Sequence, residues 1–162
     1  MSDTIQFKIE GMESLIAKLE GITYDLKRKG GRAGLRKSAN VVAKALAENA
    51  SRIDDPKSAA DISKNVAVRF SNRTFKSTGD LKFRVGILGG AGGRAKSESL
   101  SGLPGGDSRH WRQQEFGNEN HPAQPFARRA LSENINQATE TFVTEYSKSI
   151  DRAIKRAAKG KK

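Results

Sequence analysis

Residues 112–131 read RQQEFGNENHPAQPFARRAL, and they decide where the last helix of the chain begins. Gly117 allows a backbone turn that a Cβ atom would obstruct. Pro122 and Pro125 then restrict the chain, and proline suits the start of a helix. The segment therefore predicts a hinge that aims a terminal helix at a sheet.

The residues on either side of the hinge indicate what it joins. Residues 110–116 are predicted to return to the sheet as a short strand, with Phe116 buried at its end. Phe126 is predicted to fill the core beneath the crossing. The helix that follows carries a stripe of mainly apolar residues at helical spacing: Phe126, Leu131, Ile135, Ala138, Phe142, Tyr146, Ile150 and Ile154.

Two helices and a strand are predicted in the N-terminal third. Thr4–Glu10 alternates apolar and polar residues, the period of a strand with one buried face. From Met12 to Leu26 the apolar residues recur every three or four positions, as along an amphipathic helix. Gly30 and Gly31 then separate this helix from a second one over residues 32–50. We expect the two helices to pack as a pair.

Two further strands are predicted in the middle of the chain, at residues 66–70 and 81–87, where apolar and polar residues alternate. Residues 71–80 between them are polar, and we expect an extended, mobile tip. Residues 89–109 are rich in glycine and serine and predict a flexible loop.

These elements predict an α+β fold with a small, mostly antiparallel sheet, packed by two N-terminal helices and a long C-terminal helix. Residues 1–155 are expected to form a single domain of this kind. Residues 156–162 form a basic tail that we expect to be frayed.

Composition constrains the partners. The 162 residues carry a formal net charge of +12 and include no cysteine. Such a charge attracts polyanions or acidic protein surfaces, and without thiols the chain has no disulfide and no thiolate nucleophile. The N-terminus does not resemble a signal peptide and no run of about 18 apolar residues occurs. We expect a soluble protein that is not exported by that route and has no membrane partner.

Catalytic groups are sparse. His110, His121 and Glu115 match no metal-binding or paired-carboxylate spacing, and Asp54-Asp55 before a proline is typical of a turn. The glycines at 89–93 lack the lysine and following helix of a phosphate-binding loop. The sequence therefore predicts no enzyme and no metal or other cofactor; a nuclease would require a carboxylate or histidine cluster that cannot be assembled here.

Basic residues recur along the predicted sheet and its loops: Arg69, Arg73, Lys76, Lys82, Arg84, Arg94 and Lys96. They are candidates to face an interface or the phosphates of DNA, and the alternative is a solvated outer face. Because only Phe70, Phe75 and Phe83 lie nearby, stacking on bases is not expected. The same two interpretations apply to the basic residues from 148 to 162.

The segment from Glu115-Phe116-Gly117-Asn118 to Pro122-Ala-Gln-Pro125-Phe126 and Arg128-Arg-Ala-Leu131 resembles a hallmark of the head–tail joining, or tail-completion, proteins of lambda-like tailed bacteriophages. The order of predicted elements is also similar to that family. Asn118 stands where the family more often has threonine or serine, and the glycine-rich loop is longer.

The resemblance implies a structural virion protein of the neck or tail joint, assembled in the host cytoplasm. Its partners would be copies of itself in a ring, with sixfold symmetry to match the tail. They would also include a tail-terminator or tail-tube protein and the head connector, with non-specific DNA contact in the channel. Within the motif, Glu115, Arg128 and Arg129 are the candidates for pairing across a subunit boundary. The alternative function is that of a small basic DNA-binding protein.

Overall fold

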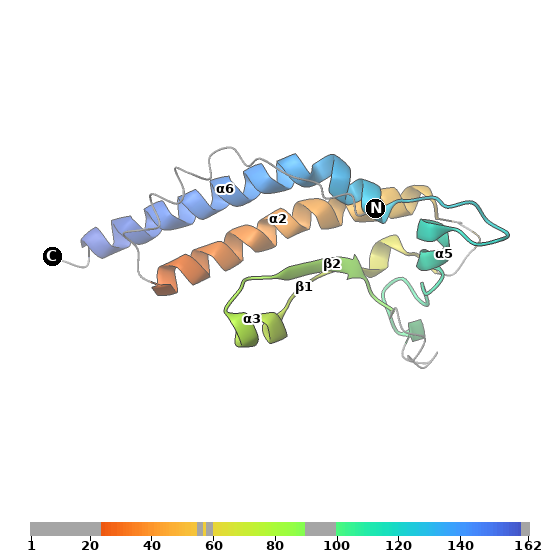
Figure 1. Ribbon diagram of the computed structural model, residues 1–162, viewed down its shortest axis with the longest axis horizontal. Coiled ribbons are helices and arrows are strands. Elements are labelled where there is room, and N and C mark those ends of the chain that lie inside the picture. Colours follow the sequence, from red (N-terminus) through yellow and green to blue (C-terminus); the bar gives the residue numbers. More distant parts are fainter. Residues whose placement is uncertain (1–23, 55–56, 58–59, 90–99, 160–162) are drawn as a thin grey trace.

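Two long helices lie side by side over a β-hairpin (Figure 1). This computed structural model describes residues 24–54, 57, 60–89 and 100–159. The elements are α2 (Tyr24–Arg52), η1 (Ser63–Asn65), β1 (Val66–Phe70), α3 (Asn72–Thr78), β2 (Phe83–Ile87), α5 (Trp111–Phe116) and α6 (Ala127–Lys159). The predicted α+β class, with its antiparallel sheet and long C-terminal helix, is confirmed. The predicted strand Thr4–Glu10 and most of the predicted helix from Met12 lie outside the described residues.

Helix α2 runs without a break through Gly30 and Gly31, so the predicted separation at these glycines is wrong. The reason is a close approach to α6. A Cβ atom on Gly30 would stand 2.7 Å from the Ser149 hydroxyl oxygen, and one on Gly34 would stand 3.3 Å from the backbone nitrogen of Tyr146. Glycine disfavours a helix by about 1 kcal/mol, and the packing of two long helices outweighs this.

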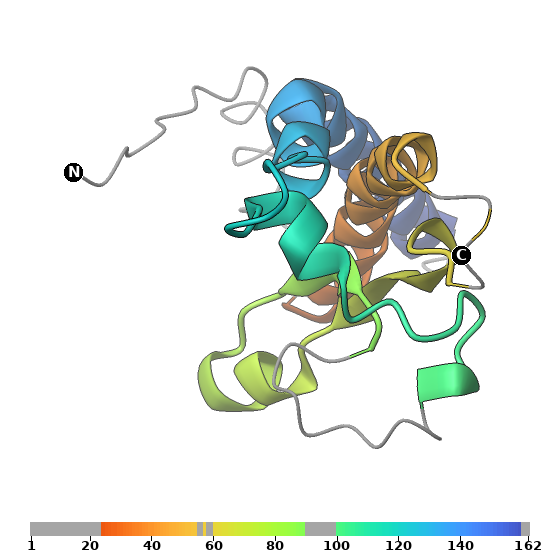
Figure 2. The same cartoon turned by 90° about the vertical axis from the view of Figure 1, so that its right-hand side faces the viewer.

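Strands β1 and β2 pair antiparallel, with Val66 opposite Ile87 and Phe70 opposite Phe83, which confirms the two predicted strands. In the view along the long helices, α2 lies between α6 and this hairpin (Figure 2). The predicted mobile tip is instead the short helix α3. Its Phe75 ring packs 5.6 Å from that of Phe70, centroid to centroid, so an apolar contact holds the polar tip on the strand. Gly79, at a φ of 78°, ends the helix.

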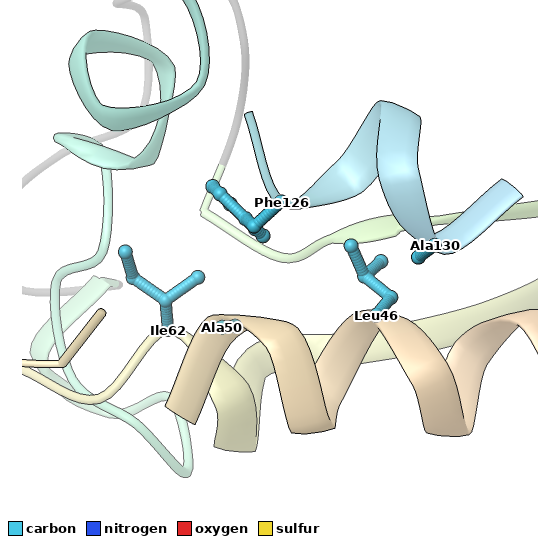
Figure 3. Packing of buried hydrophobic residues seen from close by; sticks show 5 residues of the cluster. All are labelled: Leu46, Ala50, Ile62, Phe126 and Ala130. Carbon is cyan, nitrogen blue, oxygen red and sulfur yellow. The ribbon is translucent and has the colours of Figure 1, made fainter. Parts of the chain in front are cut away.

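The core lies where the end of α2 meets the start of α6 (Figure 3). Leu46 and Ala50 of α2 face Phe126 and Ala130, and Ile62 closes the cluster. Phe126 is only 2% exposed, which confirms its predicted place in the core.

The predicted apolar face of α6 is only partly covered. Ala138, Tyr146 and Ile150 are buried, whereas Leu131 and Ile154 are about half exposed. The helix continues to Lys159, so residues 156–159 of the basic tail belong to α6. Residues 160–162 lie outside the described part.

The fully buried Asn65 fixes the far end of the glycine-rich segment to the hairpin. Its amide nitrogen donates to the Gly106 carbonyl at 2.8 Å and to the Ser108 hydroxyl at 2.7 Å, and its amide oxygen accepts from Gly105 at 2.9 Å. Leu100 is also buried. The prediction of a flexible loop over 89–109 is therefore wrong for residues 100–109, while residues 90–99 lie outside the described ranges.

Replacing Asn65 by alanine is expected to lower the free energy of unfolding by about 3 kcal/mol, because Gly105, Gly106 and Ser108 each lose a hydrogen bond and two of these residues are buried. Urea denaturation measures this. The matched control is Asn72→Ala at the exposed start of α3, which is expected to change stability by less than about 0.5 kcal/mol. Equal effects at the two positions would contradict the assigned role of Asn65.

Candidate interaction surfaces

Glu115 binds the N-terminus of α6. It lies on α5, the short helix that replaces the strand predicted over 110–116. Its carboxylate accepts backbone N–H bonds from Phe126 and Ala127 at 2.8 Å and from Arg128 at 3.2 Å. A helix begins with four unpaired N–H groups and a partial positive charge, and this carboxylate satisfies three of the groups.

Glu115 is only 1% exposed. Burial by itself raises the pKa of a carboxyl group. Here the hydrogen bonds from Ala127, Arg128 and Phe126 outweigh burial and lower the pKa of Glu115 below its ordinary value. The Arg128 guanidinium donates to the carboxylate at 2.9 Å. The prediction that Glu115 is a candidate for pairing across a subunit boundary is therefore wrong: its partners are within the chain.

Gly117 makes the turn between α5 and α6, as predicted. Its φ is 72°, a conformation that favours glycine. A Cβ atom there would lie 2.8 Å from the backbone nitrogen of Ala123 and 3.0 Å from the His121 carbonyl oxygen. Exposed Pro122 and half-buried Pro125 lie on the crossing that follows. The segment thus forms a hinge between two helices rather than between a strand and a helix.

Gly117→Ala is expected to lower the free energy of unfolding by about 2–3 kcal/mol, because the left-handed conformation and the backbone contact both oppose a side chain. The control is Gly102→Ala, where an added Cβ meets nothing within 4 Å. Its effect is expected to be below about 0.5 kcal/mol. If thermal or urea unfolding shows a similar loss of stability for Gly117→Ala and Gly102→Ala, the hinge tolerates a side chain at position 117.

Phe116 is 61% exposed, which overturns its predicted burial. A short helix at 111–116 turns its side chain outward, whereas a strand ending there would have turned it inward. The Arg128 guanidinium carbon lies 5.2 Å from the centroid of the Phe116 ring. Arg129 is also exposed and lines a hollow of about 400 Å³ with Arg52 and Glu133. The hinge therefore presents an aromatic ring and two arginines on the surface.

A basic hairpin, which we define as residues 66–87, collects five of the predicted cations. Arg69 on β1 stands directly opposite Arg84 on β2. Arg73 and Lys76 lie on α3, and Lys82 precedes β2. All five are exposed, and none forms an ion pair with an acidic residue in the described part of the chain. Asp80 is the single acid in this stretch. Arg94 and Lys96 lie outside the described residues.

Two of the three phenylalanines of the basic hairpin, Phe75 and Phe83, pack at a tilt against the third, Phe70. Phe70 lies 5.2 Å from Phe83, centroid to centroid. The Arg32 guanidinium covers Phe70 and that of Arg28 covers Phe75, each 4.0 Å from the ring centroid. These rings are engaged within the fold, so the hairpin offers charge and no free stacking platform for bases.

An apolar groove of about 460 Å³ runs between the long helices and β2. We define it by its lining: Leu35, Ser38, Ala39, Val42, Leu46, Phe83, Val85, Gly86, Ile87, Trp111, Ala127, Leu131, Ile135 and Ala138. The exposed side of Leu131 belongs to one wall. The indole N–H of Trp111 is buried and has no acceptor among the described residues. Sequence patterns do not predict this groove, because it depends on how α6 is placed over the sheet.

The remaining candidate groups stay apart. His110 precedes α5, and His121 lies in the exposed turn that closes on Asn118. In the described ranges no three histidine, aspartate or glutamate side chains gather as they would around a metal ion. None of the described helices is long and apolar enough to cross a membrane.

No protein-family model, no curated protein and no solved structure matches this chain.

Proposed function

We propose that this protein is a structural subunit of the neck or tail joint of a tailed bacteriophage, where it forms a ring around the DNA channel and attaches tail to head. The observation that carries the proposal is exposed Phe116. The other aromatic residue of the same motif, Phe126, is buried in the core, and the carboxylate of Glu115 is bound to the start of α6. An exposed phenylalanine outside the core suits a protein interface.

The surroundings of Phe116 support this role. Aromatic residues and arginine are enriched in protein interfaces, and buried aromatic anchors supply much of the binding energy. The Arg128 guanidinium stays over the Phe116 ring and is also bonded to Glu115, so both side chains are held in place before a partner arrives. A held anchor loses less conformational entropy on binding than a mobile one.

Light scattering on the purified chain, alone and mixed with a tail-tube protein, tests the proposal. The expected result is a finite assembly in at least one of the two conditions, because a heterologous interface that closes on itself gives a ring. Two results together would overturn the proposal: the chain stays monomeric in both conditions, and tails join heads in its absence.

Phe116→Asp is expected to weaken that assembly by roughly a hundredfold in dissociation constant, as the removal of an interface anchor does. The monomer should unfold at nearly the same denaturant concentration, because the exposed ring contributes only its contact with the Arg128 guanidinium. The matched control is Glu119→Gln, an exposed position in the same turn region. If the Phe116→Asp variant assembles as fully as the native chain, the interface does not include Phe116.

The second candidate function is a small DNA-binding protein, and the basic hairpin is the observation that favours it. Arg69 and Arg84 face one another without an acid between them, an arrangement that is unfavourable until an anion arrives. Affinity that falls steeply with salt would indicate phosphate contacts. A ring interface built around Phe116 should largely survive the same salt.

A further inference from the structure

The outer edge of β2 has unpaired backbone groups. In the described part of the chain β2 pairs with β1 alone. Hydrogen bonds from Ser71 to the Lys82 carbonyl and from Leu88 to the Asn65 carbonyl fix the phase of the ladder. Bonded and non-bonded pairs alternate in an antiparallel ladder. The N–H and C=O groups of Phe83, Val85 and Ile87 therefore point away from β1, toward the outer edge.

This edge borders the apolar groove. The groove takes lining residues from β2 and none from β1. A second hollow, of about 520 Å³, lies against the outer face of the sheet and includes Arg69 and Arg84. Val85, Gly86 and Ile87 line both spaces, so the edge of β2 is the divide between them. A strand placed at this edge would turn alternate side chains into the groove and toward the outer face.

The sequence supplies a segment with that pattern. Ile5, Phe7 and Ile9 alternate with Gln6 and Lys8. The apolar set suits the groove, where Leu131 and Ile135 of the predicted α6 face lack a covering element among the described residues. The polar set suits the outer face. One seven-residue segment could therefore place apolar side chains in the groove and polar side chains on the outer face, while its backbone pairs with the edge of β2.

The same polypeptide can deliver this segment. Residues 11–23 separate it from α2, and 13 residues span about 20 Å as helix and about 43 Å when extended. The groove begins at Leu35, 11 residues into α2, or about 17 Å along the helix axis. In either conformation, residues 11–23 are long enough to bring Thr4–Glu10 to the groove. A segment tethered in this way binds without the entropy loss of bringing two molecules together.

We propose that the groove and the outer edge of β2 are the binding site for Thr4–Glu10 of the same chain, which adds a third strand to the sheet. This inference stands apart from the proposed ring, because a monomer would show it as well. It also assigns the groove an internal occupant, which leaves Phe116 and the basic hairpin as the surfaces for partners.

Disulfide scanning of the full chain tests the site, because no native cysteine competes. Arg84→Cys on the outer face is combined in turn with Gln6→Cys, Phe7→Cys and Lys8→Cys, and each double variant is oxidised briefly. Facing positions on adjacent strands lie within disulfide reach. The expected result is an intrachain disulfide for position 6 or 8, formed roughly tenfold faster than for position 7, whose side chain faces the opposite side.

Two controls define the geometry. Arg69→Cys replaces Arg84→Cys in one series; it lies on the same face but one strand further away, about 10 Å from the added strand, and is expected not to react. A tenfold dilution should leave the intrachain rate unchanged. Disulfide-linked dimers in place of the intrachain product would overturn delivery by the same chain. Equal rates at positions 6, 7 and 8, or no disulfide at any of them, would overturn the added strand.

Discussion

Replacing Glu115 by alanine is expected to lower the free energy of unfolding by about 3–4 kcal/mol, the largest effect of any single substitution proposed for this chain. Three backbone N–H groups at the start of α6 lose their acceptor, and Arg128 loses its carboxylate. Phe126, the first of those donors, is a core residue, so the disturbance reaches the packed cluster. For a protein of this size we expect the melting temperature to fall by about 10 °C.

The pH dependence of stability gives a second measurement of the same role. Hydrogen bonding lowers the pKa of Glu115 in the folded state, so its contribution is fully present above the ordinary glutamate pKa. That contribution is lost as pH falls through the folded value. Glu115→Gln removes the titrating group. The stability gap between the native chain and this variant should therefore shrink as the solution is acidified from pH 7 to pH 3.

Glu119→Gln is the matched control, since it makes the same chemical change four residues away at an exposed position. It should shift the unfolding free energy by less than about 0.5 kcal/mol. If Glu115→Gln and Glu119→Gln behave alike at neutral pH, the carboxylate does not hold the helix start. The turn at Gly117 and the packing of Phe126 would then account for the hinge alone.

Local pattern predicted the elements of this fold better than their junctions. The alternation of residues 66–70 and 81–87 and the stripe along the last helix each depend on one segment at a time. The strands form at 66–70 and 83–87, and the helix forms, although Leu131 and Ile154 of its stripe are about half exposed. The break at Gly30 and Gly31 was wrong because helix propensity is a local property, whereas the close approach to Tyr146 involves residues more than a hundred positions away. A glycine that marks a loop and one that admits a neighbouring helix look the same in sequence.

The hinge shows the same limit. Residues 110–116 carry too few apolar residues to distinguish a strand from a short helix, and that choice decides which way Phe116 points. The capping role of Glu115 spans 11–13 residues and lies outside the usual capping motifs, where the carboxylate is three positions from the cap. In the sequence, the capping role is marked only by an acidic residue, Glu115, that precedes the turn at Gly117 and the helix start at Pro125-Phe126.

Neutralising Arg69 and Arg84 together, each to glutamine, is expected to weaken binding to a short DNA duplex of arbitrary sequence by about 30-fold at 0.15 M salt, if both meet phosphates. The slope of log affinity against log salt should fall by about 1.8, or 0.9 for each phosphate that is no longer neutralised. Folding stability should stay the same or rise slightly, because two like charges that stand directly opposite each other are removed.

The control for that pair is the double variant Lys44→Gln and Lys148→Gln, which removes the same charge from exposed positions on α2 and α6. A general attraction between a basic protein and DNA depends on total charge, so both double variants would then weaken binding equally. A surface that contacts the phosphates directly makes the Arg69 and Arg84 pair the more damaging. Weakening confined to that pair, with stability unimpaired, would place DNA against the outer face of the hairpin, whereas equal weakening would leave this face as solvated charge.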